Sequence, residues 1–146
     1  MSQMLAFVFP GQGSQSLGML AELAAVHPVV RAAFDEASEG AGVDLWTLSQ
    51  QGPEEQLNQT EFTQPALLAA GVATWRAWEA AGGPRPSLLA GHSLGEYAAL
   101  VAAGAISLAD GARLVLERGR LMQLAVPSGN GSMAPVLGSE DEQVAD

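Results

Sequence analysis

Two short segments, Leu5–Phe9 and Pro86–Ala90, constrain the fold of this chain more than any other feature. Leu5–Phe9 is apolar at every position and ends at Pro10-Gly11, while Pro86–Ala90 runs into a second glycine-rich turn. Strands without alternating polar residues are typical of a parallel sheet that is buried on both faces. The stretches between and after these segments carry helix signals. The sequence therefore predicts an α/β fold with a parallel sheet flanked by helices.

Helix start and end signals divide the rest of the chain. Pro127–Gly131, rich in Pro, Gly and Ser, is the best candidate boundary, so we expect one unit over residues 1–126 and the beginning of another over 127–146. The second unit starts with a hinge, followed by a strand at 132–138 and a helix from Ser139. The predicted helices of the first unit cover Met19–Ala25, Pro28–Ser38, a short segment from Pro53, Thr63–Ala81, the residues after the second strand to about Ala103, and Ser107–Ala125; Asp44–Gly52 is predicted to be turn-rich.

Charge and residue usage exclude several classes of function. Sixteen acidic against six basic residues give a net charge of -10, which argues against nucleic-acid binding and against docking on anionic lipid. The chain has no Cys, so it has neither a disulfide scaffold nor a thiolate nucleophile. All six basic residues are Arg, which excludes a lysine Schiff base. No apolar run is long enough for a signal peptide or a membrane span, so we expect a cytoplasmic protein.

Gly91-His92-Ser93-Leu94-Gly95 fits the pattern Gly-x-Ser-x-Gly between a predicted strand and a predicted helix. A serine at such a sharp turn projects its hydroxyl away from the sheet. The N–H groups that follow lie at the positive end of a helix, where they stabilise an oxyanion. Ser93 is therefore a candidate nucleophile, and a plain strand-to-helix turn is the alternative.

The two histidines do not supply an obvious general base. His92 is adjacent to Ser93, and neighbours on such a turn diverge, so it is either a hydrogen-bond donor near a bound acyl group or a packing residue of the turn. His27 precedes Pro28 and is expected at an exposed helix end. An enzymatic interpretation must therefore find its base elsewhere.

Arg118 is unusual among the arginines of the last predicted helix. Asp110, Arg113, Glu117 and Arg120 form a charged stripe, but the neighbours of Arg118 one turn away are apolar: Leu114, Val115, Leu121 and Met122. An arginine on that face is expected to point inward and to need an anion. The partner is either an acid from elsewhere in the chain or a bound carboxylate, which guanidinium holds in a bidentate manner.

The loop after the first strand, Gly11-Gln12-Gly13-Ser14-Gln15, is not a dinucleotide-binding motif. Loops at the carboxyl ends of parallel strands lie beside the active-site crevice. The Gln12 N–H is therefore a candidate second oxyanion donor.

Four motifs together resemble one family. Phe7–Gln15 (FVFPGQGSQ), Thr63–Ala66 (TQPA), Gly91–Tyr97 (GHSLGEY) and Glu117–Gly119 (ERG) occur in the order seen in bacterial malonyl-CoA:acyl carrier protein transacylases of fatty-acid synthesis. The likeness is to the N-terminal portion of that family and covers essentially the whole chain. It implies a hydrolase-like α/β subdomain over residues 1–126, and the start of a ferredoxin-like subdomain over 127–146.

The resemblance also implies a reaction and its residues. Ser93 would form a malonyl ester from malonyl-CoA and pass it to the phosphopantetheine thiol of acyl carrier protein. Backbone N–H groups of Gln12 and Leu94 would form the oxyanion hole, and Arg118 would clamp the malonyl carboxylate. His92 and Gln64 would line the substrate pocket. No cofactor or metal is implied.

Three hypotheses follow. The first is a malonyl transferase whose catalytic histidine lies in a C-terminal half that this chain does not contain, so a C-terminal fragment of the same enzyme is a further expected partner. The second is a serine esterase, in which water would be the acceptor. The third is a non-catalytic fragment or binding module that needs a second chain.

Overall fold

The computed structural model describes residues 4–126, 129–131 and 136–138. In these residues two strands and seven helices follow one another as an α/β arrangement. No helix of this described part is long and apolar enough to cross a membrane. The elements are β1 (Ala6–Phe9), α1 (Ala21–Val26), α2 (Pro28–Ala41), α3 (Leu45–Gln51), α4 (Glu54–Leu57), α5 (Thr60–Ala80), β2 (Leu88–Gly91), α6 (Gly95–Ala102) and α7 (Leu108–Ala125).

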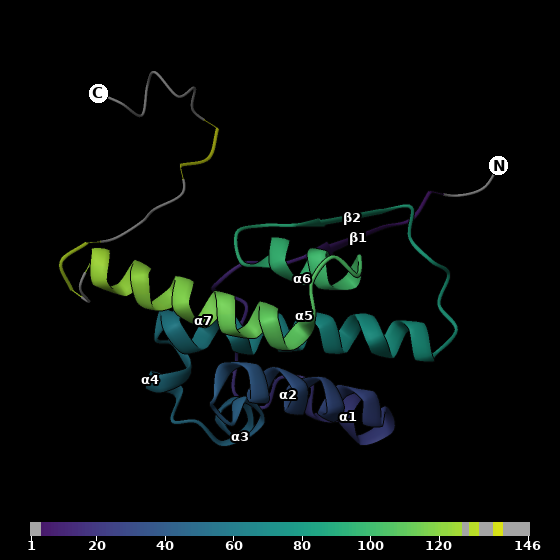
Figure 1. Ribbon diagram of the computed structural model, residues 1–146, viewed down its shortest axis with the longest axis horizontal. Helices are drawn as coiled ribbons and strands as arrows, with labels where there is room; N and C mark the ends of the chain where they lie inside the picture. The colour runs from purple at the N-terminus through teal and green to yellow at the C-terminus, as the bar shows by residue number, and fades with distance from the viewer. Residues whose placement is uncertain (1–3, 127–128, 132–135, 139–146) are drawn as a thin grey trace.

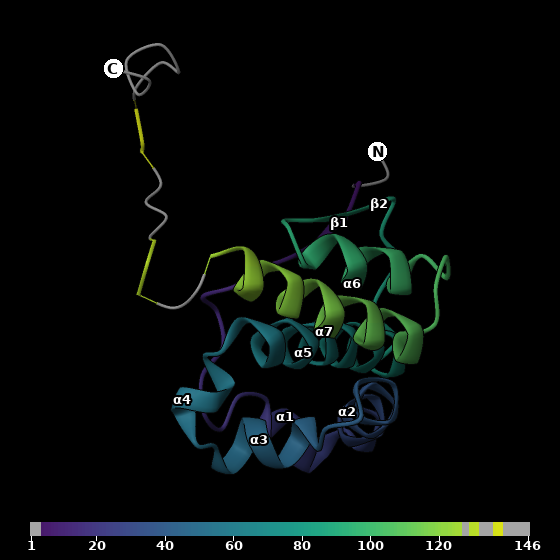
Figure 2. The ribbon, with the colours of Figure 1, turned by 60° about the vertical axis from the view of Figure 1, so that its left-hand side comes forward.

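The two strands pair in parallel, as the sequence predicts. The register places Ala6 opposite Leu88 and Phe9 opposite Gly91. Figures 1 and 2 show the strands at one side of the molecule with α6 directly beneath them, α5 and α7 in the next layer, and α1, α2 and α3 on the far side. The carboxyl ends of both strands therefore meet beside the start of α6 and the middle of the helical layer.

The prediction that both faces of the strands are buried is wrong for the described part of the chain. Phe9 is only 4% exposed, whereas Val8 is 72% and Leu88 is 59% exposed. Side chains alternate between the faces of a strand, and the described elements cover only the face that packs on the helices. The other face of this two-stranded sheet is open.

The core lies between α2, α5 and α7, and it is built from side chains of moderate size. Phe34 of α2, Leu68 and Val72 of α5, and Val115 of α7 are completely buried in it. Phe7 connects the sheet to this core, because its ring contacts Trp75 edge to face at 5.2 Å between ring centroids. The core thus fixes α5 and α7 relative to the strands, and these elements carry the candidate site.

Most predicted helices are confirmed, but one further helix is present and α5 begins earlier than predicted. The predicted turn-rich stretch Asp44–Gly52 contains helix α3, which begins because the Asp44 carboxylate accepts a hydrogen bond from the Thr47 backbone N–H at 2.9 Å. Helix α5 begins at Thr60 rather than Thr63, so Pro65 lies inside it. The predicted cap of α7 is confirmed, since Ser107 Oγ accepts from the Asp110 N–H at 3.1 Å.

The predicted second unit cannot be judged from the described residues. Residues 127–128, 132–135 and 139–146 lie outside them, and with them most of the predicted strand and the predicted helix start. Residues 136–138 are described and are not part of a strand.

Candidate active site

Ser93 lies on the turn that joins β2 to α6, and its backbone is left-handed, with φ of 54°. The turn is narrow because two glycines face each other across it: a Cβ on Gly91 would lie 2.0 Å from the carbonyl of Gly95. Ser93 is exposed, while the next residue, Leu94, is 1% exposed. The turn therefore holds the serine hydroxyl outward in a backbone conformation that non-glycine residues rarely adopt, as a nucleophile elbow requires.

The same turn contacts the end of β1. The His92 N–H donates to the Phe9 carbonyl at 3.1 Å, and a Cβ on Gly95 would lie 2.3 Å from that carbonyl oxygen. The loop after β1, which contains Gln12, is thereby placed next to Ser93. Within the described part of the chain, the backbone N–H groups of Gln12 and Leu94 donate to no other group. Both are available to a ligand at this edge.

The loop after β1 is anchored to the connection between α4 and α5. The Gln12 side chain donates to Thr60 Oγ1 at 3.2 Å. Gln15 accepts from the Gly13 N–H at 2.9 Å and donates to Asn58 Oδ1 at 2.8 Å. These bonds use the Gln12 side chain and leave its backbone N–H free, which suits an oxyanion donor.

Arg118 of α7 reaches Ser93 directly. Its Nη2 donates to Ser93 Oγ at 2.9 Å, and its Nη1 donates to Gln64 Oε1 at 2.8 Å. Both acceptors are neutral, and Arg118 takes part in none of the ion pairs formed among the described residues. Of the two partners that the sequence left open, an acid from elsewhere is therefore not found in this part of the chain.

Gln64 of α5 is completely buried, and both ends of its amide are bound. Its oxygen accepts from Arg118, and its Nε2 donates to Met122 Sδ at 3.3 Å. The family resemblance implies a role for Gln64, whereas Met122 enters the sequence analysis only as one of the apolar neighbours of Arg118. The available signal was its spacing, because Met122 follows Arg118 by four residues and so shares its helix face.

The apolar neighbours of Arg118 are less buried than the sequence predicts. Val115 is completely buried, but Leu114, Leu121 and Met122 are 48%, 58% and 39% exposed. With Arg118 they line an open hollow of about 460 Å³ on α7. The expectation of an inward, core-facing arginine is thus wrong: the described elements leave this strip of α7 uncovered, and Arg118 is half-buried at its edge.

Close contact between α5 and α7 sets the position of Arg118. A Cβ on Gly119 would lie 2.6 Å from Glu61 Cα and 2.7 Å from the Thr60 carbonyl oxygen, so the helices can cross this closely only with glycine here. Arg120 then bonds Glu61 at 3.0 Å across the same crossing. The charged stripe is otherwise confirmed as an exposed face, with Arg113 and Asp110 2.7 Å apart.

Neither histidine of the chain is placed as a general base for Ser93. His92 is exposed and lies against Gly11, where a Cβ would be 2.8 Å from His92 Nδ1. His27 lies at the junction of α1 and α2. Figure 2 shows these two helices on the side of the helical layer away from the strands. Among the described residues, neither histidine forms a hydrogen bond with Ser93.

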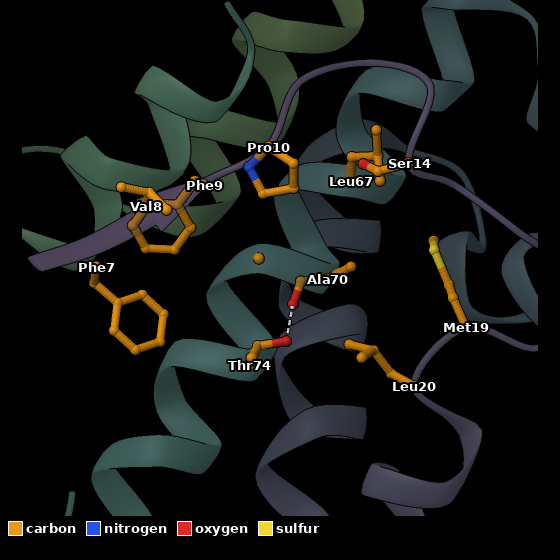
Figure 3. Close-up of a pocket in the computed structure, with 11 residues that line it drawn as sticks. Phe7, Val8, Phe9, Pro10, Ser14, Met19, Leu20, Leu67, Ala70 and Thr74 are labelled. Atoms are coloured by element: carbon orange, nitrogen blue, oxygen red, sulfur yellow. Dashed lines mark hydrogen bonds between the residues drawn. The ribbon is translucent and has the colours of Figure 1, made fainter. Parts of the chain in front are cut away.

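A second cavity lies on the helix-facing side of β1 (Figure 3). It has a volume of about 200 Å³, and none of its lining side chains is titratable. Its two hydroxyls are already bonded, Ser14 to the Gly11 carbonyl at 3.0 Å and Thr74 to the Ala70 carbonyl at 2.9 Å. The lining residues offer no acid or base, so this hollow is not a candidate for the chemistry.

Comparison with known proteins identifies acyl transferases as relatives of this chain. Residues 6–145 match the family model described as an acyl transferase domain. The malonyl CoA-acyl carrier protein transacylase of Salmonella typhimurium is 61% identical over 140 residues, which are 96% of this chain and 45% of that protein. The crystal structure of malonyl-CoA:acyl carrier protein transacylase from Xanthomonas oryzae pv. oryzae is 72% identical, with a TM-score of 0.93 over 97% of this chain and 45% of that chain.

A further solved structure contains a type II PKS acyl-carrier protein in complex with its malonyl-transacylase. It is 64% identical to this chain, with a TM-score of 0.83, and the match covers 87% of this chain and 41% of that one. This chain therefore spans less than half the length of the relatives it matches.

Proposed function

The chain belongs to the acyl transferase domain family, and we propose from this that it carries the nucleophile and the carboxylate clamp of a malonyl transferase. The reaction moves a malonyl group from malonyl-CoA to the phosphopantetheine thiol of acyl carrier protein. The observation that carries the proposal is the 2.9 Å contact between Arg118 Nη2 and Ser93 Oγ. This contact places the Arg118 guanidinium beside the serine hydroxyl, where the free carboxylate of a malonyl ester would lie.

Ser93 Oγ attacks the thioester carbonyl of malonyl-CoA, and the oxyanion that forms is held by the backbone N–H groups of Gln12 and Leu94. The C–S bond then breaks, coenzyme A leaves with the proton from Ser93, and a malonyl-Ser93 ester remains. The phosphopantetheine thiol attacks this ester, and its proton returns to Ser93 Oγ. Both transfers conserve the acyl group and need no cofactor.

Arg118 selects acyl groups that end in a carboxylate. The Arg118 guanidinium has five N–H groups. The bonds to Gln64 and Ser93 use one N–H on Nη1 and one on Nη2, so further N–H groups remain for a carboxylate. A charged acceptor forms stronger hydrogen bonds than the neutral Ser93 hydroxyl, so the carboxylate displaces that contact. Gln64 and His92 complete the pocket wall around the clamp.

The proton-transfer base is supplied from outside the described residues. A C-terminal fragment of the same enzyme is the partner we propose for this role, and a chain that lacks it would bind without turning over. We also propose that residues 1–126 are part of a hydrolase-like α/β subdomain, since the parallel strands end at a nucleophile elbow. The ferredoxin-like unit proposed for residues 127–146 rests on the family resemblance.

A serine esterase is the second candidate within the same chemistry. Water would then accept the acyl group, and Arg118 would have no carboxylate to hold. The position of Arg118 at the nucleophile favours the transferase.

Intact mass spectrometry of the chain assembled with the base-containing C-terminal fragment, after addition of malonyl-CoA, tests the proposal. We expect a malonyl adduct that is absent from Ser93→Ala, provided that a base-containing partner is present. Adduct formation that persists in Ser93→Ala would show that another group is acylated and would contradict the assignment of the nucleophile.

A further inference from the structure

The Gln64 amide is held at both ends by two residues of one helix. Arg118 donates to its oxygen at 2.8 Å, and Met122 accepts from its nitrogen at 3.3 Å. Arg118 and Met122 are four residues apart in α7, so they project from the same helix face and reach one amide from α5. A continuous chain of hydrogen bonds thus runs from the Met122 sulfur through Gln64 and Arg118 to Ser93 Oγ.

Both neighbours of the Gln64 amide, Arg118 and Met122, favour the same orientation of that amide. Gln64 is completely buried, so water does not compete for its amide. If the amide were turned around, its NH₂ group would face the Arg118 guanidinium, and two donors would oppose each other. The Met122 sulfur is a weak acceptor, but it is the acceptor that the Nε2 group finds, and it therefore favours the orientation in which Oε1 faces Arg118.

We propose that Met122 is a positioning residue: through its sulfur it fixes the Gln64 amide, and through that amide it orients the Arg118 guanidinium toward Ser93. The part that concerns substrate rests on the proposed function, because an oriented guanidinium matters only if it binds a carboxylate. The part that concerns the amide stands on the hydrogen bonds alone. Met122 itself touches no substrate in this scheme.

NMR of the ¹⁵N-labelled chain tests the positioning step without requiring turnover. In Met122→Leu, which keeps the size and apolar character of the side chain but removes the acceptor, we expect the Gln64 Nε2 protons to exchange with solvent about three- to tenfold faster. We also expect the Arg118 guanidinium signals to show faster rotation. Met122→Gln restores an acceptor on an unbranched side chain, and it should return both signals toward those of the unsubstituted chain.

Met19→Leu is the matched control, because Met19 lines the separate cavity beside β1. It makes the same chemical change away from Gln64 and should leave both signals unchanged. Circular dichroism shows whether each variant is folded. Gln64 and Arg118 signals that are the same in Met122→Leu as in the unsubstituted chain would overturn the proposal, and so would an equal response in Met19→Leu.

Titration with malonate separates this inference from the proposed function. If Arg118 binds carboxylates, malonate should bind Met122→Leu about three- to tenfold more weakly, and equal affinities would overturn the substrate part of the inference. If malonate binds neither protein while the amide signals respond to Met122→Leu, the positioning role stands and the carboxylate assignment fails.

Discussion

Ser93 carries the backbone strain of the elbow in a single residue. A left-handed conformation costs about 1–2 kcal/mol for a residue with a Cβ, whereas glycine adopts it freely. We therefore expect Ser93→Gly to be about 1 kcal/mol more stable than Ser93→Ala, although both lack the hydroxyl. Urea denaturation of the two variants measures the difference. Ala98→Gly in the ordinary helix α6 is the control and should lose stability; a loss in Ser93→Gly relative to Ser93→Ala would contradict the strain.

The selectivity proposed for Arg118 is also a property of one residue. A charged hydrogen bond is worth about 1.5–3 kcal/mol, so Arg118→Ala should slow acylation of Ser93 by malonyl-CoA about 10- to 100-fold more than acylation by acetyl-CoA. Mass spectrometry of the adducts in the base-containing assembly gives both rates. Arg120→Ala removes a neighbouring arginine that pairs with Glu61, and it should not change the ratio. Equal losses for both acyl groups in Arg118→Ala would exclude the carboxylate clamp.

At the scale of single residues, the sequence predicts which residues belong to the candidate site better than it predicts what those residues contact. The Gly-x-Ser-x-Gly pattern points to Ser93 because it lies between a predicted strand and a predicted helix, and helix periodicity singles out Arg118 among six arginines. Periodicity cannot show what Arg118 contacts, since its partners come from α5 and from the turn after β2. Periodicity does not distinguish Met122 either, because its partner Gln64 also comes from α5. A methionine at helical spacing is usually a core residue.

Among the elements, the crossing of α5 and α7 depends most on a single position. In Gly119→Ala the added methyl group would meet the backbone of Thr60 and Glu61, which cannot move aside as a side chain can. We expect a loss of about 1–3 kcal/mol in the free energy of unfolding. Gly111→Ala in the same helix is the control, because its methyl group would meet only side-chain atoms of Leu68, Val101 and Ile106, at 3.2 Å or more. The higher helix propensity of alanine should offset most of the cost of these side-chain contacts in Gly111→Ala. Equal losses of stability in Gly119→Ala and Gly111→Ala would contradict the close helix crossing as the cause.

Helix α3 makes stability depend on pH through its cap. Hydrogen bonds from the Thr47 N–H and hydroxyl lower the pKa of Asp44 below its usual value of 3.8. Because the folded state has the lower pKa, the stabilisation is fully present above pH 3.8 and is lost as the pH falls through the folded pKa. Asp44→Ala should therefore cost about 1 kcal/mol at pH 7 and less at pH 3, as measured by urea denaturation. Asp44→Asn keeps a cap without the charge, and a loss in Asp44→Ala that does not change with pH would contradict the charge effect.

The short length of α3 explains why the sequence does not predict it, whereas longer elements are predicted. Trp46 and Leu48 indicate burial, but seven residues are too few for helical periodicity to emerge, and the flanking glycines suggest turns. The longer α7 was predictable, because Ser107 and Asp110 mark its start and eighteen residues reveal its faces. The predicted start of α5 is too late because a proline is a common signal for the first turn of a helix. In the structure this proline, Pro65, lies in the second turn.

At the scale of the whole molecule, the sequence predicts the fold class but not the exposure of its sheet. Apolar strands are buried on both faces only when elements cover both, and residues 4–126 supply helices for one face. The open surfaces, namely the strand face with Val8 and Leu88 and the strip of α7 with Leu114, Leu121 and Met122, flank the candidate site. Apolar surfaces of this kind are typical of interfaces or of aggregation.

We therefore expect the isolated chain to bind a hydrophobic dye and to self-associate as its concentration rises. The double variant Val8→Thr, Leu88→Thr places a β-branched, polar strand former at both positions of the open face. It should therefore reduce self-association in sedimentation velocity while changing the free energy of unfolding by less than about 1 kcal/mol. Phe9→Thr makes a polar change on the covered face, where the side chain is 4% exposed, and should cost about 3 kcal/mol or more. If the double variant were destabilised as much as Phe9→Thr, the strand face would be covered in solution, which would contradict an open sheet face.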